Sequence, residues 1–303
     1  MKFAKHENAP AWNGLLVDAH RHGLYDLHPV RTLAGIAVED WESEPQFVEH
    51  ERWTKQLRGS ALCNALLPWL HFSRDEGVGS VLDFSGKHAR AEVAAACEGA
   101  GLRTASPVWW DAWKPNLWPK PMALILPDER ETDGHAAAVA RDYLAAEPDG
   151  WLTLHAAESP VRAQIGKERL GGSIVVWLAR EELLGPRTLL VHGNALGAAD
   201  FELATEAGTA VVLCPAVREA LAHPTPAVPS NMRVFFGTDA PLASGERSLL
   251  AQARSEVQRW STNGSRATAV ERAATALLRP LFNDKPPTPR ASRELAAFLF
   301  NGL

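Results

Sequence analysis

The chain has 303 residues, of which 46% are hydrophobic and 22% are charged, a balance typical of a globular enzyme. Its net charge of −5 offers no basic surface for nucleic acid or for acidic membranes. No apolar run approaches the roughly 20 residues that span a bilayer, and residues 1–8 lack the apolar core of a secretory signal. Three cysteines without Cys-x-x-Cys spacing indicate reduced thiols. We therefore expect a cytoplasmic protein that binds neither nucleic acid nor membranes.

Apolar runs of strand length alternate with segments of helical periodicity along the chain, a pattern typical of repeated βα units. The predicted strands cover residues 15–22, 80–84, 102–110, 122–126, 151–155, 188–192, 210–214 and 233–239. The predicted helices cover residues 44–70, 87–100, 134–146, 160–184, 198–207, 245–260 and 266–278. A loop rich in proline and tryptophan follows the third strand at residues 111–121.

Strands and helices in this order predict a (β/α)₈ barrel, a fold that commonly takes about 250 residues. A doubly wound open sheet is the alternative, but such sheets concentrate their chemistry at one switch point. Here polar residues end both the first and the last strand, and these two strands are neighbours in a closed barrel. We expect the barrel to cover residues 1–280, followed by a linker and a capping helix over residues 281–303.

Four histidines and one aspartate stand at the ends of separate apolar strands: His20 and His22, His155, His192, and Asp239. A lone histidine at a strand end is more often a hydrogen-bonded structural residue than a metal ligand. The coincidence changes this balance, because the C-terminal ends of barrel strands all open on one face. The other seven of the 11 histidines fall in polar, loop-like or helix-like segments. The pattern therefore predicts a metal site at the C-terminal face of the barrel.

His20 and His22 share one face of their strand, because side chains alternate in direction, and Arg21 points the other way. Together with His155 and Asp239 they form a set of three imidazoles and one carboxylate. This set suits one Zn²⁺ ion, or Fe²⁺, with an open position for water. A bound metal lowers the pKa of that water and makes it a nucleophile at neutral pH.

Two further residues can complete a catalytic site. Glu158 follows His155 by three positions and can protonate a ring nitrogen while water attacks the adjacent carbon. His192 can orient that water or accept its proton. The alternative for Glu158 is an acid near a helix N-terminus that complements the helix dipole. Beside His155 we favour the catalytic role.

The ordered motifs His-x-His, His-Ala-Ala-Glu, His-Gly-Asn and Gly-Thr-Asp span residues 15 to about 255. They resemble those of the amidohydrolase superfamily, particularly its mononuclear deaminases and chlorohydrolases. The resemblance implies a (β/α)₈ barrel with one divalent metal and hydrolytic removal of ammonia from an aromatic amine. It assigns the acid to Glu158 and the orienting base to His192. It places the metal ligands at His20, His22, His155 and Asp239, the last of which also relays a proton in that family.

The chain departs from that family in three places. Only 19 residues precede His20, too few for the β-sandwich that flanks many of these barrels, so the layout is closer to adenosine deaminase. Related enzymes often read Cys-Pro-x-Ser-Asn after the seventh strand, whereas residues 214–218 read Cys-Pro-Ala-Val-Arg, which leaves the substrate open. No lysine ends the fourth strand to bridge two metals. Asp128 or Glu129 could take its place, but Pro127 and the run of charges predict a solvated loop instead.

Substrate contacts are predicted at the rim of the same face. Trp109 or Trp110, at the end of the third strand, can stack on a planar ring, although structural packing of both is an equal alternative. Asp83 near the end of the second strand and Arg218 after the seventh can contact polar groups of a substrate.

The leading interpretation is a metal-dependent hydrolase that deaminates a cyclic amidine, that is, an amino-substituted heterocycle or nucleoside-like compound. An amide, lactam or chloro leaving group is the nearest alternative, because Glu158 can serve as ring-nitrogen donor for both deamination and dechlorination. A catalytically silent ligand-binding barrel is the alternative from another class, and the complete set of acid, base and ligands argues against it. A homodimer is common in the superfamily and stays open here.

Overall fold

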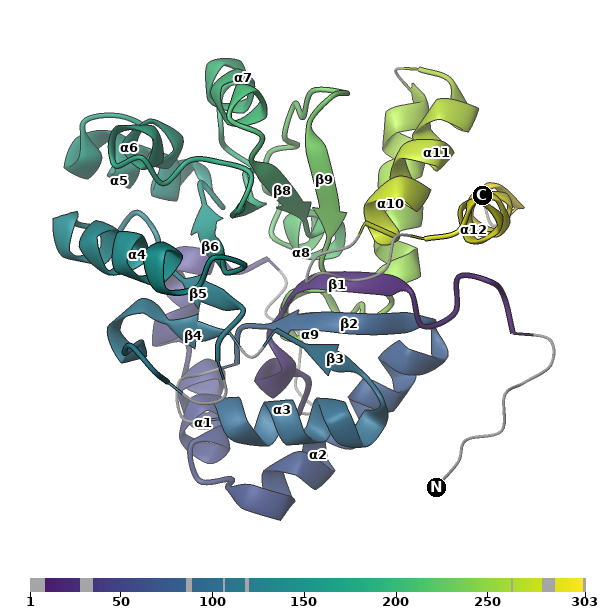
Figure 1. Cartoon of the computed structure of the whole chain (residues 1–303), viewed down its shortest axis with the longest axis horizontal. Coiled ribbons are helices and arrows are strands. Elements are labelled where there is room, and N and C mark those ends of the chain that lie inside the picture. The colour runs from purple at the N-terminus through teal and green to yellow at the C-terminus, as the bar shows by residue number, and fades with distance from the viewer. Residues whose placement is uncertain are drawn as a thin grey trace.

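The computed structural model describes residues 9–27, 35–85, 89–105, 107–117, 120–262, 264–279 and 287–301. Within these residues one parallel sheet forms, with helices outside it (Figure 1). Its strands are β1 (Leu16–Arg21), β2 (Val78–Asp83), β3 (Arg103–Thr104), β4 (Val108–Trp109), β5 (Ala123–Ile125), β6 (Trp151–Ala156), β7 (Thr188–His192), β8 (Ala210–Leu213) and β9 (Arg233–Phe236).

The sheet closes into a barrel between β3 and β4, which together take the place of the third predicted strand. Its order is β3-β2-β1-β9-β8-β7-β6-β5-β4, so β3 and β4 are its two edges, although only residues 105–107 separate them. The Ala105 N–H donates to the Val81 carbonyl of β2 at 3.3 Å, and the Ala105 carbonyl accepts from the N–H of Met122, directly before β5, at 2.9 Å. The strand predicted over residues 102–110 is therefore two short strands joined by a link that closes the barrel. The predicted (β/α)₈ fold is confirmed.

Helices follow the strands around the barrel, and none of the described helices is long and apolar enough to cross a membrane. The short 3-10 helices are η1 (Gly23–Leu27), η2 (Val38–Ser43) and η3 (Trp110–Ala112). The α-helices are α1 (Pro45–Thr54), α2 (Gly59–Asp75), α3 (Arg90–Ala100), α4 (Gly134–Ala146), α5 (Pro160–Leu170), α6 (Ile174–Arg180), α7 (Ala198–Glu206), α8 (Pro215–Ala220), α9 (Pro241–Ser244), α10 (Leu249–Thr262), α11 (Arg266–Leu277) and α12 (Pro289–Asn301).

Alternate side chains of each strand pack into two separate apolar cores. In β7, Leu189 and Val191 point into the barrel, whereas Leu190 joins the layer between sheet and helices. In β6, Leu152 and Leu154 face the same outer layer. Strands that are buried on both faces read as nearly continuous apolar runs, which explains why their positions can be predicted from the sequence.

Polar residues and glycines set the ends of the helices near the C-terminal face. Asp133, Ser159 and Ser173 each accept a hydrogen bond from a backbone N–H in the first turn, and so begin α4, α5 and α6. Gly171 has a φ of 67°, which a glycine adopts without steric cost, and it ends α5. The single helix predicted over residues 160–184 is therefore divided into two.

The C-terminal helix α12 packs beside the start of β1, away from the predicted site (Figure 1). The Glu294 carboxylate accepts a hydrogen bond from the Ala11 N–H at 2.7 Å, and the rings of Phe298 and Trp12 lie 5.4 Å apart. The linker predicted before this helix falls largely on residues 280–286, which lie outside the described residues.

Candidate metal centre and active site

An irregularity in β1 turns His20 into the barrel. Ala19 belongs to the inner core, so strict alternation would point His20 outward. The register between β1 and β2 shifts between Asp18 and Arg21, as at a β-bulge. This shift lets His20 face inward, where its ring lies 4.2 Å from that of Phe84.

The outward-facing neighbours fix this irregular strand in place. As predicted, Arg21 points away from the site, and its Nη1 donates to the Ser73 hydroxyl of α2 at 2.6 Å. The Asp18 carboxylate accepts hydrogen bonds from the N–H (3.0 Å) and the hydroxyl (2.6 Å) of Thr238, directly before Asp239. The end of β9 is therefore tied to β1 beside the histidines.

His192 reaches the same centre through a tight turn at the end of β7. Val191 points into the inner core, so alternation would direct His192 toward the helices. Instead His192 has a φ of 71°, and the Gly193 N–H donates to the Val191 carbonyl at 3.1 Å, which closes a γ-turn. The ring of His192 consequently stacks 5.3 Å from the ring of His155. Such a φ costs a non-glycine residue on the order of 1–2 kcal/mol, and strain of this kind is typical of functional sites.

Asp239 is the second strained residue, with a φ of 58°. Its N–H donates to the His20 carbonyl at 2.9 Å, and its carbonyl accepts from the His22 N–H at 3.0 Å. Gly237 permits this close approach, because a Cβ there would lie 2.7 Å from the His20 carbonyl oxygen. Asp239 is thus held by its backbone between the two histidines.

The donor atoms of these residues gather at ligand-like separations. His20 Nε2 lies 3.3 Å and His22 Nε2 lies 3.7 Å from Asp239 Oδ1, and the Nε2 atoms of His22 and His155 lie 3.4 Å apart. Ligands of a tetrahedral Zn²⁺ ion, at about 2.0–2.1 Å from the metal, lie about 3.3 Å from one another. Among the described residues, the buried Nε2 of His20 has no hydrogen-bond partner of good geometry. The set therefore fits one divalent ion.

The donor atoms form two overlapping groups that could hold a metal, within 4.8 Å of one another in each group. One group consists of His20, His22 and His155, and the other of His20, His192 and Asp239. His192 therefore lies close enough to be a ligand as well as the orienting base that the resemblance assigns.

Burial sets the protonation of the site. It lowers the pKa of His22 to about 3 with help from the neighbouring His20, and it also lowers the pKa values of His155 and His192. Burial alone would raise the pKa of Asp239, but the surrounding imidazoles hold it below its usual value. Neutral imidazoles beside an ionised carboxylate are the protonation states that bind a metal.

Glu158 lies beside His192, with 3.8 Å between its Oε1 and the imidazole Nε2. Burial, reinforced by the charge of Asp239, raises the pKa of Glu158 to about 8. Its carbonyl accepts a hydrogen bond from Asn194 Nδ2 at 3.0 Å, which gives the asparagine of the His-Gly-Asn motif a role. The N-cap of α5 is Ser159, so Glu158 is not needed to begin that helix.

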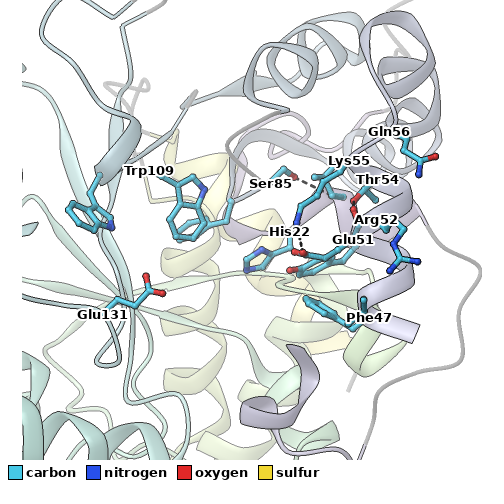
Figure 2. A pocket seen from close by; sticks show the side chains of 15 residues that line it. His22, Phe47, Glu51, Arg52, Thr54, Lys55, Gln56, Ser85, Trp109 and Glu131 are labelled. Carbon is cyan, nitrogen blue, oxygen red and sulfur yellow. Dashed lines mark hydrogen bonds and ion pairs between the residues drawn. The ribbon is translucent and has the colours of Figure 1, made fainter. Parts of the chain in front are cut away.

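Two adjoining cavities open beside these residues. The smaller, of about 270 Å³, is lined by His155, Glu158 and Asp239. The larger, of about 970 Å³, has side chains of α1 on one wall (Figure 2). The residues that line both are His22, Tyr25, Phe47, Trp109 and Glu131. Trp109 therefore lies where a planar ring could stack, whereas no sequence motif indicated Tyr25 or Phe47 as cavity residues.

Trp110 lines only the larger cavity, and its ring also packs edge-on against His135, with 5.5 Å between centroids. Trp110 therefore both packs against a neighbouring side chain and lines a cavity, which were the two alternatives for this residue.

Asp83 is placed differently from its prediction as a rim residue. It is buried at the end of β2, where its two oxygens accept hydrogen bonds from the Ser85 N–H (2.7 Å) and the Gly23 N–H (3.2 Å). It therefore holds the loop after β1 against the loop after β2, and its oxygens are engaged by backbone.

Arg218 also differs from its prediction as a substrate contact. It lies in α8, and its buried guanidinium forms ion pairs with Glu256 of α10 and with Glu219. Its position in α8 directs the side chain toward α10. Arg218, which follows the Cys-Pro motif, is therefore engaged in ion pairs and is not a substrate contact.

The loop after β5 is not the solvated loop that its charges predicted. Glu129 is only 1% exposed, and its carboxylate accepts a hydrogen bond from the Ala157 N–H at 2.5 Å. Asp128 forms ion pairs with Arg130 and with the buried Arg162 of α5, which lines the smaller cavity. The position of Glu129 shortly after a strand end could have indicated a buried role, but the adjacent charged residues predicted exposure instead.

No family model matches the sequence, and no curated protein matches it. Solved structures do match its fold. An adenosine deaminase from Xanthomonas campestris with bound zinc superposes with a TM-score of 0.68 at 18% identity, covering 90% of this chain and 68% of that one.

Two other solved structures have comparable TM-scores with the chain. A variant of the atrazine chlorohydrolase from Arthrobacter aurescens, complexed with zinc and atraton, gives a TM-score of 0.68 at 15% identity and covers 93% of this chain and 70% of that one. Guanine deaminase from Bradyrhizobium japonicum gives 0.64 at 16% identity, covering 92% and 68%. The chain therefore shares the barrel fold of these solved structures.

Proposed function

We propose that the chain is a metal-dependent hydrolase that removes ammonia from an amino-substituted aromatic heterocycle. One observation carries the proposal: a buried carboxylic acid, Glu158, stands beside a cluster of neutral imidazoles and one carboxylate that fits a single divalent ion. A metal site alone would serve many reactions. The addition of an acid that is protonated at neutral pH favours chemistry in which a ring nitrogen must gain a proton.

His20, His22, His155 and Asp239 would hold the ion, and three imidazoles with one carboxylate suit Zn²⁺ better than the harder cations, with Fe²⁺ as the alternative. When bound, the ion lowers the pKa of a coordinated water and so supplies a nucleophile near neutral pH. Zinc in the similar adenosine deaminase and chlorohydrolase structures supports this choice.

The protein side chains divide the proton transfers between them. Glu158, with its pKa near 8, is protonated at neutral pH and donates to the ring nitrogen next to the carbon under attack. His192 Nε2 lies 3.8 Å from both Glu158 Oε1 and Asp239 Oδ2. Neutral His192, between two carboxyl groups, would orient the attacking water, accept one of its protons and pass that proton to the departing amino group, which leaves as ammonia. The other proton of the water would restore Glu158 to its protonated form.

Aromatic side chains favour a planar substrate. Tyr25, Phe47 and Trp109 line the smaller cavity, which also contains the metal-binding side chains His155 and Asp239. Stacking of a heterocycle on one of these rings would hold the reacting carbon beside the metal site, and an offset stack of this kind contributes about 0.5–1.5 kcal/mol.

Hydrolytic dechlorination is the second candidate, because the similar atrazine chlorohydrolase has the same fold. A protonated Glu158 would serve it equally well, since both reactions begin with attack on a ring carbon next to a nitrogen. The two reactions differ in the leaving group alone.

The test is a panel of adenine, guanine, cytosine and pterin amines, nucleosides and chlorinated triazines, incubated with the zinc-loaded protein. We expect ammonia release from at least one amine and none from the His155→Ala variant. Chloride release without ammonia would replace deamination by dechlorination. Turnover confined to linear amides would contradict the proposal, and so would a protein that binds the compounds without converting any of them.

A further inference from the structure

The acid Glu158 depends on the backbone of a single residue. His155 and Glu158 are separated by Ala156 and Ala157, and Ala157 has a φ of 44°. This left-handed conformation bends the chain after β6, so that His155 and Glu158 both line the smaller cavity. A non-glycine residue keeps such a conformation only where its surroundings hold it.

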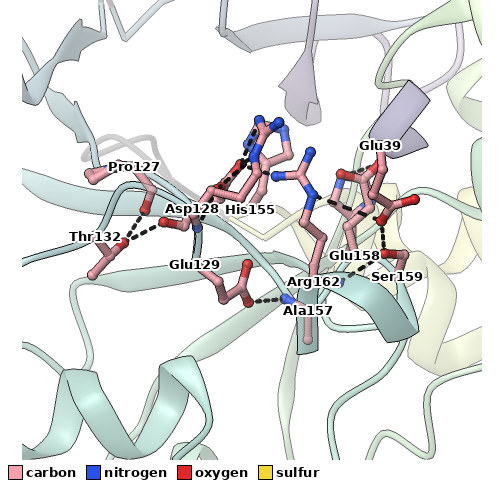
Figure 3. A network of polar contacts seen from close by, with 12 residues as sticks. Glu39, Pro127, Asp128, Glu129, Thr132, His155, Ala157, Glu158, Ser159 and Arg162 are labelled. Carbon is pink, nitrogen blue, oxygen red and sulfur yellow. Dashed lines mark hydrogen bonds and ion pairs between the residues drawn. The ribbon is translucent and has the colours of Figure 1, made fainter. Parts of the chain in front are cut away.

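Both backbone groups of Ala157 are held by neighbouring strand ends. Its carbonyl accepts a hydrogen bond from the Ala195 N–H at 2.9 Å, in the loop after β7. Its N–H donates to the Glu129 carboxylate at 2.5 Å, in the loop after β5. Figure 3 shows Glu129 directed at the backbone of Ala157, with Glu158 and Arg162 further along the same segment. The first of these bonds joins two backbones, whereas the second rests on one side chain.

Glu129 is itself fixed by α5, the helix that begins directly after Glu158. The Arg169 Nη1 donates to the Glu129 carbonyl at 3.1 Å. Gly166 makes room for the side chain, because a Cβ at this position would lie 3.0 Å from Glu129 Cγ. A glycine inside a helix costs about 1 kcal/mol relative to alanine, so this one gives up helix stability at the point where Glu129 packs.

We propose that Glu129 is a positioning residue that holds the Ala157 N–H and thereby aims the Glu158 carboxyl at the substrate. This inference rests on the proposed function, since it assumes that Glu158 delivers a proton. Glu129 does not line either cavity and so acts through Glu158 alone. A misplacement of about 1 Å in a catalytic group can cost on the order of 100-fold in rate. Loss of the Glu129 carboxylate should therefore lower kcat, with little effect on substrate binding or on the metal.

The test compares Glu129→Leu, which removes the acceptor, with Glu129→Gln, which keeps an acceptor oxygen. We expect the leucine variant to bind one zinc ion, to lose roughly 10- to 100-fold in kcat, and to keep KM within about threefold. The glutamine variant should recover most of the lost kcat. A leucine variant with unchanged kcat, or a glutamine variant as slow as the leucine variant, would overturn the proposal.

Gly166→Ala provides a variant in which stability and activity should move in opposite directions. The alanine adds helix propensity to α5 but presses on Glu129, so we expect an unchanged or raised melting temperature and a kcat lowered several-fold. Gly99→Ala in α3 is the matched control, because its Cβ would meet only Leu67 at an ordinary 3.7 Å. Equal kcat in both variants would contradict the placement of Glu129.

Amide hydrogen exchange at Ala157 separates this inference from the proposed function. In the zinc-loaded protein we expect faster exchange of the Ala157 N–H in Glu129→Leu than in the wild type. If no amine is converted, the proposed function is wrong, but this measurement still tests the hydrogen bond between Glu129 and the Ala157 N–H. Unchanged exchange at Ala157 would show that Glu129 does not hold the loop.

Discussion

Glu158 is protonated at neutral pH because of its surroundings, since a glutamate in water would be ionised at that pH. Burial and the nearby charge of Asp239 raise its pKa to about 8. Within the same site, burial alone would raise the pKa of Asp239, but its interactions with His192, His20 and His22 hold that pKa below its usual value, so Asp239 is ionised. The carboxyl groups of Glu158 and Asp239, each 3.8 Å from His192 Nε2, therefore have opposite protonation states, as the proposed acid and the proposed metal ligand require.

Glu158→Gln should keep the metal and lose turnover. The amide cannot deliver a proton, so we expect kcat to fall by roughly 10²–10⁴-fold, the range typical of general acid catalysis. Metal content by elemental analysis and the rate of ammonia release are the two measurements. Loss of the metal would move Glu158 among the ligands, and near wild-type turnover would return it to a role at the start of α5.

His155→Ala should empty the metal site. The imidazole is one of the donors in the group His20, His22 and His155, and its removal takes away one of the four proposed ligands and so weakens the binding of the ion. Elemental analysis should find far less than the single equivalent of zinc expected for the wild type. A variant with full metal content would remove His155 from the ligand set.

At the scale of elements, the functional side chains depend on departures from regular strand geometry. A register shift in β1 turns His20 inward, and a γ-turn redirects His192. The sequence placed both residues at strand ends, because apolar runs predict buried strands. It could not predict the irregularities, since the alternation rule taken from Ala19 or Val191 points each histidine the wrong way.

Gly237→Ala should disturb the junction of β9 and β1. The new Cβ would lie 2.7 Å from the His20 carbonyl oxygen, and backbone must move to relieve the overlap. We expect a loss of roughly 1–3 kcal/mol in stability together with weaker zinc binding. Gly134→Ala, with no atom within 4 Å of its Cβ, is the control for denaturant unfolding and zinc titration. Equal zinc affinity in the two variants would show that the approach of these strands is not critical.

The residues that the sequence misplaced were those whose partners lie on distant elements. Asp83 and Arg218 lie at or after strand ends, as the proposed metal ligands do, but their charges are engaged by Gly23 and by Glu256. Glu129 shows the reverse, because its neighbouring charges predicted exposure and the α5 packing buries it. Position along a strand is local information, whereas the partner of a charged group depends on which elements meet.

At the scale of the whole molecule, the barrel brings the ends of β1, β6, β7 and β9 and the loop after β5 into one buried polar centre, which makes stability depend on pH. Burial raises the pKa of Glu129 to about 7 and that of Glu158 to about 8, above their values in an unfolded chain. The folded state therefore binds more protons, and this stabilisation is lost as the pH rises through these values. The lowered histidine pKa values act in the opposite direction, but most of that effect falls below about pH 6.5, where the imidazoles of an unfolded chain are protonated.

Above pH 6.5, the metal-free protein should therefore lose stability as the pH rises. From pH 6.5 to 8.5 the two carboxyl groups together account for about 2–3 kcal/mol. Urea unfolding of the metal-free protein at both pH values measures this loss. Glu129→Gln should reduce it by about 1 kcal/mol, because one of the two groups no longer titrates. A wild-type protein whose stability is constant or rises over this range would contradict the burial of these acids.

The proposed reaction depends on one metal ion that is required for the release of ammonia. The most direct test is to remove the metal with a chelator and to titrate Zn²⁺ back while following ammonia release from an amine that the panel identifies. We predict no release without metal, and a rate that rises in proportion to added zinc until about one equivalent per chain and then stays level. Full activity in the metal-free protein, or a rate that levels off only at two equivalents, would contradict a single-metal site.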